Sequence, residues 1–155
     1  MITKEKITDF LNEWGDSIIE IGKLNDKSDE QRKLTVEILK KLYGYGEFEV
    51  LFTPTKASQK PFRPTFEGAL SYFVADSPDF PEDHGFAKNP WTKVRFDIKG
   101  IQIYDNVAIT MGHYFFTDLD NVELKAEYSF AIAENKNGEL KIVLHHSSLP
   151  FGYKG

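Results

Sequence analysis

Two adjacent histidines near the C-terminal end are the residues best suited to chemistry. His145 and His146 are two of the four histidines in this 155-residue chain, and they follow the apolar run Leu140-Lys-Ile-Val-Leu. An imidazole can give or take a proton near neutral pH, so a histidine in a pocket can act as a general acid or base. Successive strand residues point to opposite faces, so one of the two faces inward and the pair cannot jointly bind one metal ion.

Strand parity suggests partners for an inward-facing His145. If both faces of the sheet are buried, Arg95, His113, Glu127 and His145 form one polar row across four neighbouring strands. His145 and Glu127 are then the candidate catalytic pair for proton transfer, and Arg95 could bind an anionic oxygen. The alternatives are structural: an ion pair between Arg95 and Glu127, a core hydrogen bond for His113, and hydrogen bonds of His145 to backbone groups at the end of the last strand.

Further candidate binding residues lie around this row. They are Trp91, Tyr114, Ser147 and Glu67. Each has a structural alternative: Trp91 can serve as packing, Ser147 can satisfy backbone groups at the strand end, and Glu67 can stabilise a helix N-terminus.

A metal-binding interpretation is weaker. His113, His145 and Glu127 have the ligand types of a two-histidine, one-carboxylate iron or manganese site. The chain has no H-E-x-x-H motif, phosphate-binding glycine loop or dinucleotide fingerprint. We therefore expect a pocket without metal or cofactor.

Composition limits the class of protein. The chain is 41% hydrophobic and 14% aromatic, which suits one core with an aromatic-lined cavity or a buried oligomer face. A net charge of -5 disfavours nucleic acid and anionic membranes as partners. The absence of cysteine and of an apolar signal or membrane segment predicts a cytoplasmic protein.

The first half of the chain has helical periodicity. Apolar residues recur at helical spacing over 7–24, and Ser28 to Gln31 resembles a capping box that opens a second helix ending before Gly44. A short strand is expected over 48–52 and a third helix, capped by Thr65, up to residue 74. Residues 53–64 and 76–90 are predicted loops.

After Trp91 the pattern changes to strand alternation. Four strands are predicted over 91–104, 107–117, 122–133 and 139–147, joined by short turns. Long twisted strands curl, so N-terminal helices packed on the concave side would enclose a cavity. The expected fold is a single α+β domain over residues 1–155, a cone with helices on a long, curved, mostly antiparallel sheet.

Three segments carry a family resemblance. Residues 90–96, Met111-Gly-His-Tyr-Phe-Phe116 and Leu144-His-His-Ser-Ser-Leu-Pro150 resemble the nuclear-transport-factor-2-like superfamily. The SnoaL-like branch, which is similar to the calcium/calmodulin-dependent kinase II association domain, is the nearest match. The resemblance implies a cone that dimerises through the outer sheet face, and functions from isomerase or dehydratase to association module.

Two function classes remain open. The first is a small-molecule-binding protein or metal-free acid-base enzyme, isomerase-like or dehydratase-like, acting on a small apolar carbonyl or carboxylate compound. The second is a non-catalytic association module. The expected partners are a small, anionic ligand and a second copy of the chain, because both parity classes of the long strands are rich in apolar residues.

Overall fold

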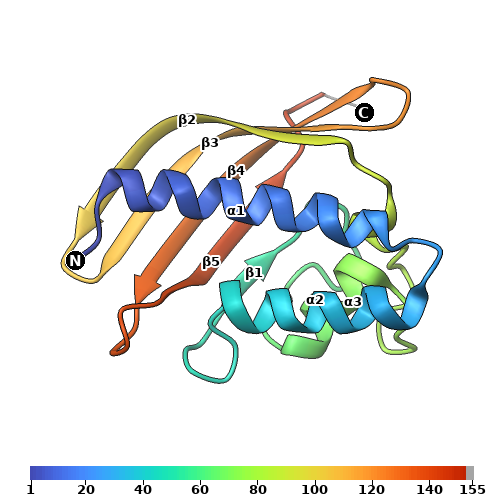
Figure 1. The fold of residues 1–155 in the computed structure, drawn as a ribbon, viewed down its shortest axis with the longest axis horizontal. Coiled ribbons are helices and arrows are strands. Elements are labelled where there is room, and N and C mark those ends of the chain that lie inside the picture. Colours follow the sequence, from blue (N-terminus) through green and yellow to red (C-terminus); the bar gives the residue numbers. More distant parts are fainter. Residues whose placement is uncertain (153–155) are drawn as a thin grey trace.

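The computed structural model describes residues 1–152 and arranges them as helices over the concave face of one curved sheet (Figure 1). The helical elements are α1 (Lys4–Lys23), α2 (Ser28–Leu42), α3 (Phe66–Val74) and the 3-10 turn η1 (Phe86–Lys88). The strands are β1 (Leu51–Thr53), β2 (Lys93–Tyr104), β3 (Val107–Thr117), β4 (Glu123–Glu134) and β5 (Leu140–Ser148). The predicted α+β class, helix positions and four-strand meander are confirmed.

Local signals explain where the helices begin. The Thr3 and Thr65 side chains accept hydrogen bonds from the amides of Lys6 and Gly68, as N-cap residues do. The capping box expected at Ser28 is wrong, because Lys27 is the N-cap and makes no side-chain cap. Gln31 instead is buried and donates its side-chain amide to the Ile21 carbonyl, which ties α2 to the end of α1.

The sheet has the order β1-β5-β4-β3-β2 and is antiparallel except where β1 runs parallel to β5. The register of β2 against β3 shifts between Ile98 and Gly100, and such a bulge increases the bend of a sheet. Gly112 of β3 allows the close approach at this bend, because a Cβ there would collide with the Asp97 carbonyl. The curvature gives the sheet the concave face that α1 covers in Figure 1.

The concave face carries the apolar parity class of β4. Ala126, Tyr128 and Phe130 are buried in the core, whereas Glu127 is exposed on the outer face. The expectation that Tyr128 and Phe130 lie at an interface is therefore wrong. The ordinary rule, in which the apolar class of a strand faces the core, decides the register.

The short strand β1 lies later in the sequence than predicted. It covers Leu51–Thr53 instead of 48–52, and it pairs with the last strand, so that Phe52 is in register with His145. This parallel edge brings the loop that follows β1 beside the end of β5. This loop carries Thr55.

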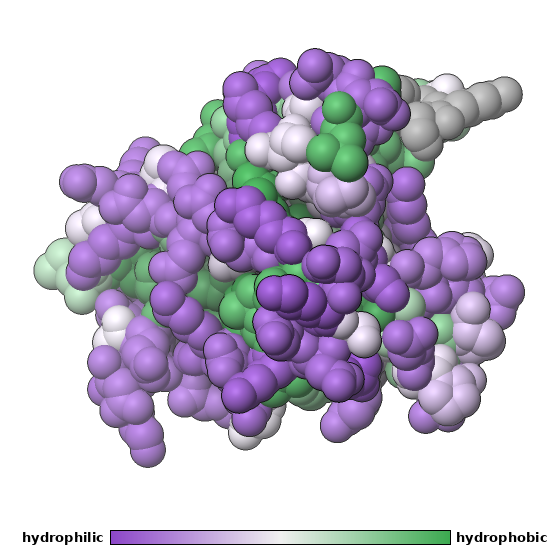
Figure 2. Space-filling view, turned by 45° about the vertical axis from the view of Figure 1, so that its right-hand side comes forward, coloured by the Kyte–Doolittle hydropathy of each residue, from purple (hydrophilic) through white to green (hydrophobic). Residues whose placement is uncertain are grey.

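The surface in Figure 2 is mostly hydrophilic, with smaller hydrophobic areas between the charged side chains. None of the helices in residues 1–152 has the length and apolarity needed to cross a membrane. The predicted homodimer stays a prediction, which light scattering at micromolar protein concentration tests.

Candidate functional site

A small cavity lies between the concave face of the sheet, α1, α3 and the loop after β1. Its volume open to the centres of water-sized molecules is about 10 Å³, roughly what one such molecule occupies. The cavity therefore suits a molecule of a few atoms. Its lining is mostly aromatic, with four hydroxyls and one imidazole among Trp14, Phe52, Pro54, Thr55, Tyr72, Phe73, Phe86, Tyr114, Phe116, His145 and Ser147.

His145 is positioned by its two neighbouring strands. It is in register with Phe130 of β4 and with Phe52 of β1. Both rings stack on the imidazole, with centroids 4.1 Å and 4.9 Å away. The stacking fixes the plane of the imidazole, and the hydrogen bonds at its two nitrogens fix its rotation in that plane.

Both nitrogens of His145 are hydrogen-bonded to tyrosines. Nδ1 lies 2.8 Å from the Tyr43 hydroxyl, and Nε2 lies 3.0 Å from the Tyr114 hydroxyl. The indole Nε1 of Trp14 donates to the Tyr43 hydroxyl at 3.1 Å. A chain of hydrogen bonds therefore runs from α1 through the imidazole to β3.

The donor at one end sets the direction of this chain. Trp14 can only donate, so the Tyr43 oxygen accepts from it and its single hydrogen is free to go elsewhere. Within residues 1–152, His145 Nδ1 is the acceptor that this hydrogen reaches. Nε2 then carries the imidazole proton and donates it to the Tyr114 oxygen, which leaves the hydrogen of Tyr114 for Ser147 or Thr55, both hydrogen-bonded to this phenol.

Burial keeps this chain uncharged. It lowers the pKa of His145 to about 3, and His146 adds a smaller lowering. It raises the pKa of both Tyr43 and Tyr114 well above the usual tyrosine range. A charged form of any of these groups would lose its hydration without gaining a counterion. The site therefore holds a neutral imidazole and neutral phenols at neutral pH.

The hydrogen-bond chain ends in hydroxyls at the cavity. Thr55 Oγ1 and Ser147 Oγ lie 2.5 Å apart, and Thr55 also hydrogen-bonds to Tyr72. Each hydroxyl has one hydrogen, and the bond between Thr55 and Ser147 uses one of the two, so one hydroxyl of the pair can donate to a negatively charged oxygen in the cavity. Preorganised donors of this kind stabilise charge that develops during a reaction.

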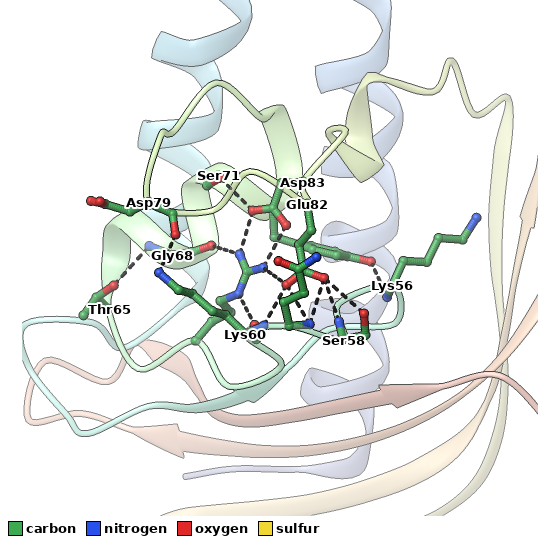
Figure 3. A network of polar contacts seen from close by, with 12 residues as sticks. Lys56, Ser58, Lys60, Thr65, Gly68, Ser71, Asp79, Glu82 and Asp83 are labelled. Carbon is green, nitrogen blue, oxygen red and sulfur yellow. Dashed lines mark hydrogen bonds and ion pairs between the residues drawn. The ribbon is translucent and has the colours of Figure 1, made fainter.

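A buried ionic cluster supports the loop that carries Thr55 (Figure 3). Arg63 is fully buried and makes two hydrogen bonds to the carboxylate of Asp83, at 2.7 Å and 2.8 Å. Arg63 also donates to the carbonyls of Lys60 and Gly68, and Asp83 accepts from Ser71. The cluster thus joins the loop after β1 to α3 and to the loop before η1.

Glu82 adds a second connection between the two loops. Its carboxylate accepts hydrogen bonds from the amides of Ser58, Gln59 and Lys60. These bonds, with those of Ser58 and Lys60 contributing most, lower the pKa of Glu82 to about 2. The loop that places Thr55 beside Ser147 is therefore attached at several points.

The structure brings together only part of the predicted site. His145 and Ser147 line the cavity and Tyr114 lies against the imidazole, whereas His146 is exposed on the opposite face, as alternation requires. Trp91 is buried beside the cavity and donates its indole N–H to the Phe86 carbonyl.

The other predicted partners lie elsewhere. Arg95 is exposed and paired with Glu123, and His113 lies 3.6 Å from Glu127 on the outer face. The expected juxtaposition of His145 with Glu127 and Arg95 is wrong, because the sheet separates them. Glu67 is exposed in the first turn of α3, the position expected for its structural alternative.

Three important residues had no clear sequence signal. Thr55 lies in a predicted loop, Tyr43 follows a helix, and Tyr72 is one of several tyrosines without distinctive spacing. Tyr43 was detectable only as an aromatic at the end of an amphipathic helix. The parallel pairing of β1 with β5, which places Thr55, has no signature in the sequence.

Comparison with known proteins identifies the family. The sequence matches the family described as Metal-independent carbonic anhydrase over residues 5–149. The chain belongs to this family. It is 36% identical over 153 residues to the Metal-independent carbonic anhydrase of Nostoc sp. (strain PCC 7120 / SAG 25.82 / UTEX 2576), covering 97% of this chain and 75% of that protein.

Solved structures agree with this assignment. The iota-carbonic anhydrase from a cyanobacterium, complexed with bicarbonate, is 35% identical with a TM-score of 0.93, covering 99% of this chain and 94% of that one. A calcium/calmodulin-dependent protein kinase II association domain from Xanthomonas campestris has 16% identity, a TM-score of 0.64, and coverage of 99% and 91%. A protein of the nuclear transport factor 2-like superfamily from Salmonella enterica has 21% identity, a TM-score of 0.56, and coverage of 98% and 93%.

The two distant structures confirm the superfamily fold that the sequence suggested. The family membership is more specific than the predicted SnoaL-like branch. The relatives support neither an isomerase nor a dehydratase of carbonyl compounds. Within residues 1–152, no three histidine, aspartate or glutamate side chains are grouped so that they could hold a metal ion.

Proposed function

We propose that the protein interconverts carbon dioxide and bicarbonate in the cavity beside His145, without a metal ion. The observation that carries this proposal is the 35% identical structure complexed with bicarbonate, together with the small cavity here that is lined by rings, hydroxyls and one imidazole. Carbon dioxide is small and apolar, and bicarbonate is a small anion. The aromatic walls suit the first, and the hydroxyls of Thr55 and Ser147 suit the second.

The reaction proceeds by attack of water on carbon dioxide. The water oxygen forms a bond to carbon, one C=O double bond becomes a single bond with negative charge on its oxygen, and one water proton leaves. The negative charge develops beside the hydrogen-bonded pair Ser147 and Thr55, where one hydroxyl of the pair can donate to it. In a cavity lined by rings, such donors stabilise the charge more than they would in water.

His145 acts through Tyr114 in this scheme. Its neutral Nε2–H donates to the Tyr114 oxygen, so the Tyr114 hydrogen stays directed at Ser147 and Thr55. A charged imidazole is not required, which agrees with its low pKa. His145 is therefore a positioning residue, and the hydroxyls contact the substrate.

The test is stopped-flow carbon dioxide hydration by the purified protein, pretreated with a chelator. We expect activity in the wild type, and Ser147→Ala to lower kcat by about 10²-fold to 10³-fold, because it removes one donor to the developing charge. Ser148→Ala is the matched control, because Ser148 follows Ser147 in β5 and its side chain lies on the outer face of the sheet. An inactive wild type, or equal loss in both variants, would overturn the proposal.

A further inference from the structure

A groove outside the cavity shares two of its walls. It offers about 400 Å³ to the centres of water-sized molecules and is far larger than the cavity. Tyr72 and Phe86 line both hollows. These two side chains therefore lie between the cavity and the groove.

A path of hydroxyl groups crosses this boundary. Ser147 contacts Thr55 at 2.5 Å, and Thr55 hydrogen-bonds to the hydroxyl of Tyr72. The Tyr72 oxygen also accepts the backbone N–H of Lys56, a residue of the groove, at 3.2 Å. Each hydroxyl can accept one proton while giving up another, so the three groups can pass a proton from the cavity to the groove.

The proposed reaction needs such an exit. Hydration of carbon dioxide releases one proton per turnover, and among residues 1–152 none that lines the cavity could retain it. Burial lowers the pKa of His145 to about 3 and raises that of Tyr114 and Tyr72. The proton must therefore reach a group that exchanges with solvent.

The charged groups of the groove leave one suitable acceptor. The carboxylates of Glu82 and Asp83 are engaged with the amides of residues 58–60 and with Arg63. Lys56 and Lys88 carry ammonium groups, which donate hydrogen bonds and have no lone pair to accept a proton. His84 is exposed, is the one imidazole of the groove, and within residues 1–152 makes neither a hydrogen bond nor an ion pair. Imidazole is the side chain that ordinarily exchanges protons near neutral pH.

We propose that His84 is a proton-transfer residue that takes the proton released in the cavity by way of Ser147, Thr55 and Tyr72, and passes it to buffer. The inference rests on the proposed function. In the hydration direction His84 becomes an imidazolium ion and then loses its proton to a buffer base. In the reverse direction it supplies the proton that bicarbonate needs to release water.

The test separates chemistry from proton release in the wild type and in His84→Ala. Exchange of ¹⁸O between carbon dioxide and bicarbonate at chemical equilibrium reports the interconversion, and stopped-flow hydration in dilute buffer requires net proton release. We expect His84→Ala to keep the exchange rate and to lose about 10²-fold in hydration kcat, as for other positioned proton-transfer groups. Free imidazole buffer should restore the hydration rate.

His146→Ala is the matched control, because it removes an exposed histidine on the outer face of the sheet. Circular dichroism of each variant confirms folding, and His84→Gln repeats the test with a longer side chain. Unchanged hydration in His84→Ala, loss of both rates together, or failure of imidazole to restore hydration would overturn the role of His84. Absence of exchange in the wild type would instead overturn the proposed function, and the role of His84 with it.

Discussion

The molecule buries two polar clusters that solve the same problem in different ways. The chain Trp14, Tyr43, His145 and Tyr114 carries no charge, and every group in it is hydrogen-bonded. The Arg63 cluster carries full charges, with guanidinium and carboxylate in direct contact. Burial without water penalises an isolated charge heavily, so a buried polar group must be either neutral or paired.

The difference matches what each cluster does. The neutral chain borders the cavity. Under the proposed function, a fixed negative charge there would repel the anionic product, and a fixed positive charge would bind it too tightly. The ionic cluster lies between the loop after β1 and α3. Its hydrogen bonds from Arg63 to the carbonyls of Lys60 and Gly68 hold the backbone of the loop that carries Thr55. Charged groups attach the loops, and neutral hydrogen-bonding groups face the cavity.

The largest effect is expected from breaking the ionic cluster. Asp83→Ala removes both hydrogen bonds of the buried Arg63 guanidinium to a carboxylate and leaves only Glu82, 3.9 Å away, so it should lower the free energy of unfolding by about 3–5 kcal/mol. Chemical denaturation measures the loss. Asp97→Ala, which removes an exposed ion pair with Lys99, is the control and should change the free energy of unfolding far less, because solvent screens that pair. Similar losses in both variants would contradict the distinction between the two environments.

A smaller effect is expected from acid on the neutral chain. The folded-state pKa of His145 is about 3, below the roughly 6.5 of an unfolded histidine. As pH falls below about 6.5, the unfolded chain binds a proton that the folded chain does not. The free energy of unfolding should therefore fall by about 1.4 kcal/mol per pH unit toward pH 4.5. Below that, protonation of carboxylates such as Glu82 adds to the loss.

Denaturation at several pH values between 7 and 4.5 tests this in two variants. His145→Gln should lack this part of the slope, because glutamine does not titrate, whereas His146→Gln, which changes an exposed residue, should keep it. An unchanged slope in His145→Gln would mean that the imidazole is not the group that resists protonation.

The sequence predicts the fold well because its signals are local. Alternation defines the four long strands, and the threonine caps of α1 and α3 lie within three residues of the groups they bind. The inward side chain of His145 follows from alternation along one strand. Contacts between distant parts of the chain are harder to predict. Thr55 contacts Ser147, 92 residues away, because the three-residue strand β1 pairs parallel with β5, and no sequence pattern indicates this pairing.

The wrong site partners have a related cause. Parity tells which residues of a strand share a face, but not which face is inside. The prediction that the polar row through Glu127 lines the pocket depends on both sheet faces being buried. In the structure Glu127 is exposed, so this condition does not hold. The face of β4 that carries Tyr128 and Phe130 is inside instead. Burying these two large side chains removes more apolar area from water than burying the face with Glu127 would.

The smallest effect is expected from that outer polar row, which supplies an exposed third case for the comparison. Glu127 lies 3.6 Å from His113, with 52% of its side chain exposed. Solvent screens such a pair, and neither group is left buried when the other is removed. Glu127→Gln should therefore change the free energy of unfolding by no more than about 0.5 kcal/mol.

Glu127→Gln should also leave the carbon dioxide hydration rate unchanged, because the sheet separates Glu127 from the cavity. Denaturation and stopped-flow assays on the same preparation check both points, with Ser147→Ala as the variant that loses activity. A loss of hydration in Glu127→Gln comparable to that in Ser147→Ala would place the chemistry on the outer face and would overturn the assignment of the reaction to the cavity beside His145.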